Sequence, residues 1–183
     1  NISYDNPGTN SDGLSTSDAF DGYNGAPDRY DWMVIGKAAR LVASNNYAAE
    51  AAPLKDFLKP QHLNQDKVRY ELHRVWEFEA KLKPGVRHSY ARRVYHSDED
   101  SWQMVASELY DGRGQIWRVQ ETHQIQRYNV PFCGSGAEIV YDLQAGRYLA
   151  TALQNDGPGV DAFADDLDVS RYTPDTVRQI GVR

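Results

Sequence analysis

Histidines and carboxylates close together in the sequence are the residues best suited to chemistry. The chain has five histidines among its 183 residues. His73 and His96 lie on either side of a turn, and Glu71 and Glu77 flank His73. A zinc site needs about three or four ligands that converge in a tetrahedron. Because only the two histidines can be placed on one face, we expect exposed polar side chains there, and no metal or other cofactor.

Three other groups also fall short of a reactive site. The acids at residues 98–100 supply too few oxygens for calcium, which takes about six to eight, so we expect a solvated turn. Cys133 has no histidine near it in the sequence that could act as its base. Glu121 and His123 form either a buried acid/base pair or an ordinary hydrogen-bonded pair, and we favour the second interpretation.

The composition excludes several classes of protein. There are 20 Lys and Arg against 26 Asp and Glu, a net charge of -6, whereas nucleic-acid binding requires clustered basic residues. The mean hydropathy of -0.69 and the lack of a long apolar run argue against a membrane-spanning helix. A single cysteine rules out an internal disulfide framework.

Alternating apolar and polar residues predict a long strand over residues 70–82. Turn signals at residues 83–86, 98–101, 111–114 and 144–146 indicate that further strands follow in hairpins. If Pro84 and Gly85 form a two-residue loop, His73 faces His96 and Glu77 faces Arg92, although a bulged turn would shift this register. The turn at residues 111–114 is expected to place Met104 opposite Val119.

These elements predict one domain in three parts. Residues 1–30 are an irregular N-terminal segment, residues 31–154 an antiparallel sheet, and residues 155–183 an acidic loop with a short C-terminal helix. Two short strands at residues 31–36 and 39–43 begin the sheet, and residues 53–58 form one helical turn. With about eight strands in meander order, the fold class is mostly β, a curved antiparallel sheet with short helices and long loops.

The apolar face of this sheet needs a partner, because the sequence contains no long amphipathic helix to cover it. Alternation cannot distinguish a closed core from a concave ligand site, since both require apolar side chains on one face. The candidates for the lining of a hydrophobic site are Trp76, Phe78, Trp102, Met104, Trp117 and Val119.

Several longer motifs resemble domain-of-unknown-function family 1329 of proteobacteria. They lie at residues 29–32, 36–37, 69–76, 98–102, 110–119 and 141–148. Residues 38–52 and 132–136 depart from the family pattern. The resemblance implies secretion to the periplasm and an open half-barrel similar to LolA and LolB, the outer-membrane lipoprotein-sorting proteins. It also implies a longer polypeptide of which this chain is the C-terminal portion, and it supplies no catalytic residues.

Three functions follow in order of preference. The first is a non-enzymatic periplasmic carrier that binds a lipid, an acyl chain or another hydrophobic molecule, and acts peripherally to the outer membrane. The second is an assembly module whose sheet docks a protein partner or the remaining N-terminal half of the polypeptide. The third is an enzyme that uses His73, His96, Glu121 or His123, for which no complete catalytic set is visible.

Overall fold

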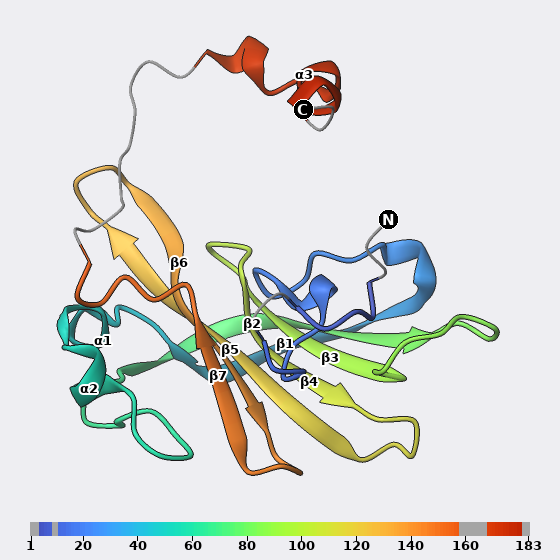
Figure 1. Ribbon diagram of the computed structural model, residues 1–183, viewed down its shortest axis with the longest axis horizontal. Coiled ribbons are helices and arrows are strands. Elements are labelled where there is room, and N and C mark those ends of the chain that lie inside the picture. The colour runs from blue at the N-terminus through green and yellow to red at the C-terminus, as the bar shows by residue number, and fades with distance from the viewer. Residues whose placement is uncertain (1–3, 9–10, 158–167, 181–183) are drawn as a thin grey trace.

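The computed structural model describes residues 4–8, 11–157 and 168–180. In these residues seven strands form one antiparallel sheet in chain order, which confirms the curved, open meander of a mostly β fold (Figure 1). The strands are β1 (Tyr30–Ala43), β2 (Tyr70–Leu82), β3 (Arg92–Asp98), β4 (Met104–Tyr110), β5 (Ile116–Arg127), β6 (Phe132–Asp142) and β7 (Arg147–Thr151).

The helices are short, as the sequence predicted. They are η1 (Ser17–Ala19), η2 (Pro27–Arg29), α1 (Tyr47–Ala51), α2 (Leu54–Phe57), η3 (Val169–Arg171) and α3 (Pro174–Ile180). Both α2 and the start of α3 at Pro174 agree with the prediction. Most of the predicted acidic loop, and Gly181 beyond α3, lie outside the described residues. Among the helices that the structure describes, none has both the length and the apolar character needed to cross a membrane.

Two of the predicted strands are a single strand. The ladder between β1 and β2 runs from the Tyr30–Leu82 pair to the Ala43–Tyr70 pair, with one irregularity between Val34 and Gly36. Gly36 has a φ of 145°, a conformation that residues with a side chain rarely adopt. The bulge therefore keeps β1 continuous where the sequence pattern is interrupted, and the described sheet has seven strands instead of eight.

The predicted hairpin registers are wrong. Glu77 pairs with His96 rather than Arg92, because residues 83–91 form a much longer connection than a two-residue loop. His73 therefore does not face His96. Val119 pairs with Glu108 rather than Met104, since the turn after β4 is wider than predicted and Asp111 N–H donates to the carbonyl of Gln115.

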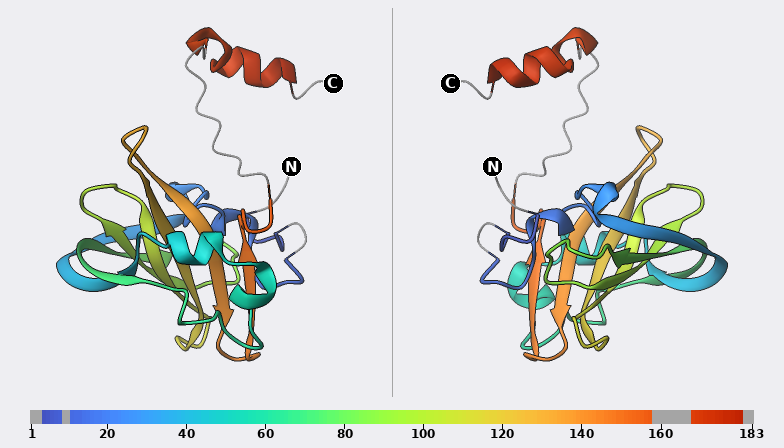
Figure 2. Two further views of the ribbon diagram at one scale, coloured as in Figure 1. Left: turned by 90° about the vertical axis from the view of Figure 1, so that its left-hand side faces the viewer. Right: turned by 90° about the vertical axis from the view of Figure 1, so that its right-hand side faces the viewer.

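The sheet curls strongly but stays open. Ser44, just after β1, forms a parallel bridge with Gln124 of β5, so the first strand bends back over the fifth (Figure 2). Val42, Val75 and Val105 are buried together in this bend. The sheet begins with β1 and ends with β7, which do not pair with each other, so the curl leaves two free edges.

Different segments cover the two faces of the sheet. On one, which we call the helix face, α1 and α2 lie against the sheet (Figure 2). There Ile139 of β6 packs with Phe57, Leu63 and Ala49 of α1 in the main apolar cluster. Alternate residues of β6, such as Glu138 and Val140, point to the opposite face. There the segment of residues 11–25 lies across the strands, and we call this the N-terminal face.

A buried ion pair holds that segment in place. The Asp18 carboxylate is 2.5 Å from the Arg93 guanidinium of β3, and both side chains are about 1% exposed. The guanidinium also lies 5.0 Å from the ring centroid of Tyr30 and 5.1 Å from that of Tyr90. Burial alone would raise the pKa of Asp18, but its contacts with His88 and Arg93 lower that pKa below the ordinary value.

Close backbone packing completes this contact. Gly22 has a φ of 77°, and a Cβ atom built on it would lie 2.5 Å from the Cβ atom of Met104. Only glycine fits there, because a side chain would collide with β4 and adopt an unfavourable backbone conformation. The segment of residues 11–25 therefore belongs to the folded core.

We expect Asp18→Ala to lower the free energy of unfolding by about 3–5 kcal/mol, because the Arg93 guanidinium would stay buried without its counterion. Urea denaturation followed by tryptophan fluorescence measures this loss. The matched control is Asp175→Ala, which removes an exposed ion pair with Arg178 and should cost less than about 1 kcal/mol. Equal losses in the two variants would contradict the structural role of Asp18.

Candidate ligand-binding site

A pocket of about 460 Å³ lies between the N-terminal segment and the sheet. Its volume is within the range of small-molecule sites, roughly 300–1,000 Å³. Its apolar wall consists of Ala19, Phe20, Val140, Leu149 and Ala152. The polar lining from the sheet consists of Gln120, Glu138 and Thr151, and that from the N-terminal segment includes Ser11, Ser15, Thr16 and Ser17.

The antiparallel ladders place the sheet residues of this pocket side by side. Val140 of β6 pairs with Gln120 of β5 and with Leu149 of β7. Glu138, two residues earlier on the same strand, pairs with Thr122 and Thr151. Because successive residues of a strand alternate between faces, all of these side chains point toward the N-terminal segment.

Glu138 has the least usual environment in the pocket. Its side chain belongs to a residue only 5% exposed, and the backbone N–H of Asp21 donates to its Oε2 atom over 3.2 Å. Among the residues that the structure describes, no Lys, Arg or His lines the pocket. Burial therefore raises the pKa of Glu138 to about 7, with the Asp21 N–H opposing part of the shift.

Gln120 adds a second acceptor beside Glu138. Its Nε2 atom donates to the carbonyl of Ala19 over 2.6 Å, which ties β5 to the N-terminal segment. This bond fixes the orientation of the amide, so Oε1 can only accept. Oε1 is buried and receives no hydrogen bond from any residue that the structure describes.

A second, more polar pocket of about 370 Å³ contains His73, Asp98 and Cys133. His73 Nδ1 is 2.6 Å from Asp98 Oδ2, and Nε2 is 3.1 Å from Glu71 Oε2. Burial lowers the pKa of His73, but the hydrogen bonds with the two carboxylates outweigh it and raise that pKa overall. Burial and the charge of Asp98 raise the pKa of Cys133, which keeps the thiol protonated and a poor nucleophile.

The acidic turn at residues 98–100 folds around its own hydrogen bonds. Asp98 Oδ1 accepts from the backbone N–H and the hydroxyl of Ser101 over 2.8 and 2.9 Å. Glu99 instead pairs with Lys37 and Arg74. No group of three or more His, Cys, Asp or Glu in the described ranges is arranged to hold a metal ion.

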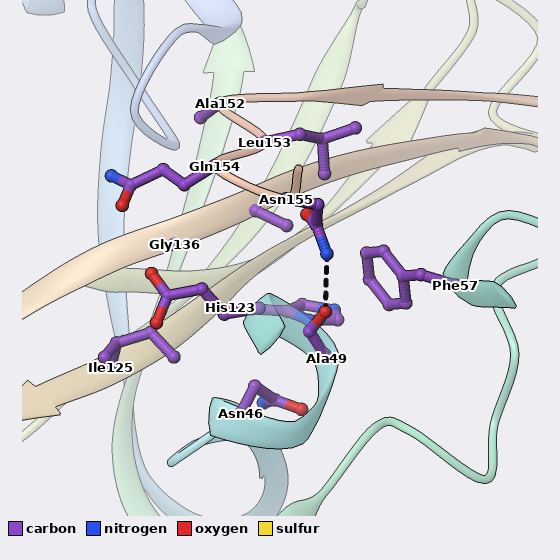
Figure 3. Close-up of a pocket in the computed structure, with 12 residues that line it drawn as sticks. Asn46, Ala49, Phe57, His123, Ile125, Gly136, Ala152, Leu153, Gln154 and Asn155 are labelled. Atoms are coloured by element: carbon purple, nitrogen blue, oxygen red, sulfur yellow. Dashed lines mark hydrogen bonds between the residues drawn. The ribbon is translucent and has the colours of Figure 1, made fainter. Parts of the chain in front are cut away.

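A third cavity surrounds His123 beneath α1 (Figure 3). Asn155 closes it by donating from Nδ2 to the carbonyl of Ala49 over 2.6 Å (Figure 3). His123 is 1% exposed, its Nε2 lies 3.7 Å from Glu121 Oε2, and neither ring nitrogen has a hydrogen bond within the described part of the chain. The free volume of about 10 Å³ is barely enough for one water molecule, so the cavity around His123 has no room for a substrate.

The family model described as "Protein of unknown function (DUF1329)" matches residues 1–178. The chain belongs to the DUF1329 family. Uncharacterized protein PA3922 of Pseudomonas aeruginosa is 48% identical over 184 residues, which cover 100% of this chain and 40% of the relative. The chain therefore spans less than half the length of this DUF1329 relative.

Two solved structures also match. One is a candidate outer membrane lipoprotein-sorting protein domain from Vibrio parahaemolyticus, at 10% identity and a TM-score of 0.44, covering 85% of this chain and 51% of that one. The other is a DUF1329 family protein from Desulfovibrio piger, at 12% identity and a TM-score of 0.44, covering 90% and 51%.

The six side chains predicted to line a hydrophobic site are dispersed in this DUF1329 chain. Phe78 and Met104 pack around the buried Tyr30, Ala80 and Tyr95. Trp102 lies in the turn before β4 and is 66% exposed. None of the six lines the 460 Å³ pocket, so their part in ligand binding stays a prediction.

The other three of the six have separate surroundings. The ring of Trp76 lies 4.6 Å from Lys37 Nζ. Trp117 donates from Nε1 to Asp142 Oδ2 over 2.9 Å, beside Arg118. Val119 pairs with Tyr141 on the helix face, away from the N-terminal segment.

The residues that build the pocket carry little sequence signal. Glu138 and Val140 alternate with Ala137, Ile139 and Tyr141, so β6 has apolar residues on both faces. The only signal is a lone carboxylate inside such a strand, because a strand buried on both faces seldom contains an acid without a partner.

Replacing Glu138 with Gln tests its environment. Because the folded pKa of about 7 exceeds the ordinary 4.5, stability falls as the pH rises through this window and stays low above pH 7. Glu138→Gln should therefore be more stable than the wild type by about 3 kcal/mol at pH 8 and equal to it near pH 4. Urea denaturation across this pH range measures the difference.

The control for this test is Asp66→Asn, which alters an exposed side chain in the loop before β2. It should follow the pH dependence of the wild type. If Glu138→Gln follows the wild type as well, the environment assigned to Glu138 is wrong.

Proposed function

We propose that this protein is a non-enzymatic carrier that binds a hydrophobic molecule, such as an acyl chain, in the pocket beneath its N-terminal segment. The observation that carries the proposal is the 460 Å³ space itself, whose apolar wall is formed by Phe20 together with Val140 and Leu149. The N-terminal segment and the sheet form opposite walls, so a bound chain would be shielded from water on two sides.

Shielding gives a physical basis for carriage. Each methylene group moved from water into an apolar pocket contributes about 0.8 kcal/mol, so an alkyl chain of moderate length supplies useful affinity. Binding entropy and desolvation oppose this gain, which keeps the complex reversible. Release without chemical change is what a carrier requires.

The surroundings of the titratable groups favour carriage over catalysis. Both ring nitrogens of His73 are engaged by Asp98 and Glu71. His123 lies in a cavity too small for a substrate. Glu138, in the large pocket, has no histidine among the described lining residues. The serine and threonine hydroxyls that line the pocket donate to other groups and not to a base. No arrangement of base, nucleophile and substrate space is assembled in the described residues.

The periplasm is the compartment that fits this proposal. The sequence motifs resemble a family whose members are secreted there, and a carrier peripheral to the outer membrane would move hydrophobic molecules across an aqueous space. The six predicted lining residues lie apart from the pocket, and Trp102, the most exposed of them, is the one that we propose as a further ligand contact.

Leu149→Trp tests the pocket by filling it. N-phenyl-1-naphthylamine, a neutral apolar fluorescent probe, should bind the wild type, and the variant should bind it at least about tenfold more weakly, a loss of about 1.4 kcal/mol. Leu143→Trp is the matched control, because this leucine lies in the β6–β7 turn and is 53% exposed. It should bind the probe as the wild type does.

Two results would count against the proposal. The absence of probe binding to the wild type would remove the carrier function. If Leu149→Trp binds normally while Trp102→Ala does not, the ligand lies on the predicted aromatic surface instead of in the pocket.

A second function, assembly through the sheet, is favoured by the exposed first strand. The apolar side chains of Met33, Val34, Ile35 and Leu41 on β1 are 50–70% exposed. Long apolar edge strands invite pairing with another strand. Since this chain spans 40% of PA3922, we propose that the rest of the longer polypeptide covers β1.

Hydrogen exchange distinguishes a covered edge from a free one. The comparison is between this chain alone and the same chain joined to the remaining residues of PA3922. In the longer protein the outward amides of β1 should exchange at least about tenfold more slowly, since they would gain strand partners. The amides of β4, a central strand, serve as the internal control and should not change. Equal exchange of β1 in both proteins would exclude this docking mode.

A further inference from the structure

The pocket holds the buried carboxyl group of Glu138, for which no counterion lies among the described lining residues. This unbalanced group points to the kind of head group that the ligand carries. We propose that the ligand is an amphiphile whose head group donates hydrogen bonds, a primary amine or an alcohol, and that Glu138 and Gln120 accept them. This inference rests on the proposed carrier function and specifies the chemistry of the same site.

The carboxyl group of Glu138 receives few hydrogen bonds. The Asp21 N–H reaches Oε2 over 3.2 Å, and no other described residue donates to the carboxyl group. The neighbouring Thr151 hydroxyl donates to the main-chain carbonyl of Glu138 instead, over 3.4 Å. A carboxylate buried in this way is costly unless a donor or a cation satisfies it.

Gln120 lies close to Glu138 on the sheet. It pairs with Val140, so it is the diagonal neighbour of Glu138 on the same face of the sheet. Diagonal neighbours lie about 7–8 Å apart, close enough for one head group to lie between their side chains. One amide hydrogen of Gln120 is committed to Ala19, and Oε1 is the atom of this amide that has no partner, so Gln120 lacks a donor to its oxygen.

The hydroxyl groups on the opposite wall already donate to other acceptors. Ser11 donates to the carbonyl of Ser15, Ser15 to that of Thr16, and Ser17 to that of Asn6. Thr16 donates to Asp18 over 2.7 Å. Thr122, whose hydroxyl has no partner, does not line the pocket. The described hydroxyls that line the pocket are therefore committed donors, whereas Glu138 and the Oε1 atom of Gln120 are acceptors short of partners, which disfavours a carboxylate or phosphate head and suits a donor.

Three ligands with the same alkyl chain test the head group. Decylamine, decan-1-ol and decanoate compete with N-phenyl-1-naphthylamine for the wild type at pH 8. The amine and the alcohol should displace the probe at concentrations at least about tenfold lower than decanoate, because only decanoate brings a second negative charge to Glu138.

Glu138→Gln should narrow the gap between decylamine and decanoate by about tenfold or more, since it removes the charge but keeps the side-chain shape. Glu108→Gln is the matched control. Glu108 lies on the helix face, where Tyr110 donates to it, and its substitution should leave the order of the three ligands unchanged.

The outcomes separate this inference from the function on which it rests. If decanoate binds as tightly as decylamine, or if Glu138→Gln leaves their ratio unchanged, the head-group assignment is overturned while the carrier function stands. If the wild type binds neither the probe nor any of the three ligands, both are overturned.

Discussion

The buried contact between Arg93 and Asp18 is the constraint on which the rest of the structure depends. These residues are 75 positions apart in sequence, and their contact joins the irregular N-terminal segment to the third strand of the sheet. A buried ion pair repays little of its desolvation, but either charge alone would be strongly unfavourable. The pair therefore acts mainly by specifying one position for the segment. With the segment in that position the pocket has two walls, and without it Glu138 and Val140 would lie on an open sheet surface.

The sheet was predictable because most of its strands alternate in polarity, and β2 shows this along most of its length, with an interruption at Arg74 and Val75. The registers were not, because irregularities interrupt the ladders. The shift between His96 and Ser97 leaves Val105 unpaired and directs Met104 toward the Tyr30 cluster. The shift between Leu109 and Tyr110 likewise leaves Trp117 unpaired, beside Arg118. After a bulge adds a residue to a strand, every later side chain of that strand points to the face opposite to the one that simple alternation assigns.

The pocket could not be predicted from the sequence, for another reason. Its described walls come from Gly8, residues 11–20 and residues 120–152, and the bond from Gln120 to the Ala19 carbonyl, which joins them, spans more than a hundred residues. Local patterns report which side chains are apolar, but not which distant loop covers them. The sequence predicts that the apolar face of the sheet needs a cover, but it does not identify the cover. The irregular segment of residues 11–25 encloses part of that face and leaves β1 exposed.

The polar lining shows why such a pocket is unlike an ordinary core. A valine at position 138 would fit the strand and avoid the desolvation of a carboxyl group, so the observed residue lowers the stability of the empty protein. Gln120 keeps an unpartnered amide oxygen on the same wall, which has the same effect. Local departures from good packing that coincide in one pocket are typical of binding sites, since the bound molecule supplies the missing partners. Two acceptors beside an apolar wall would let a carrier recognise a head group while the alkyl chain supplies most of the affinity.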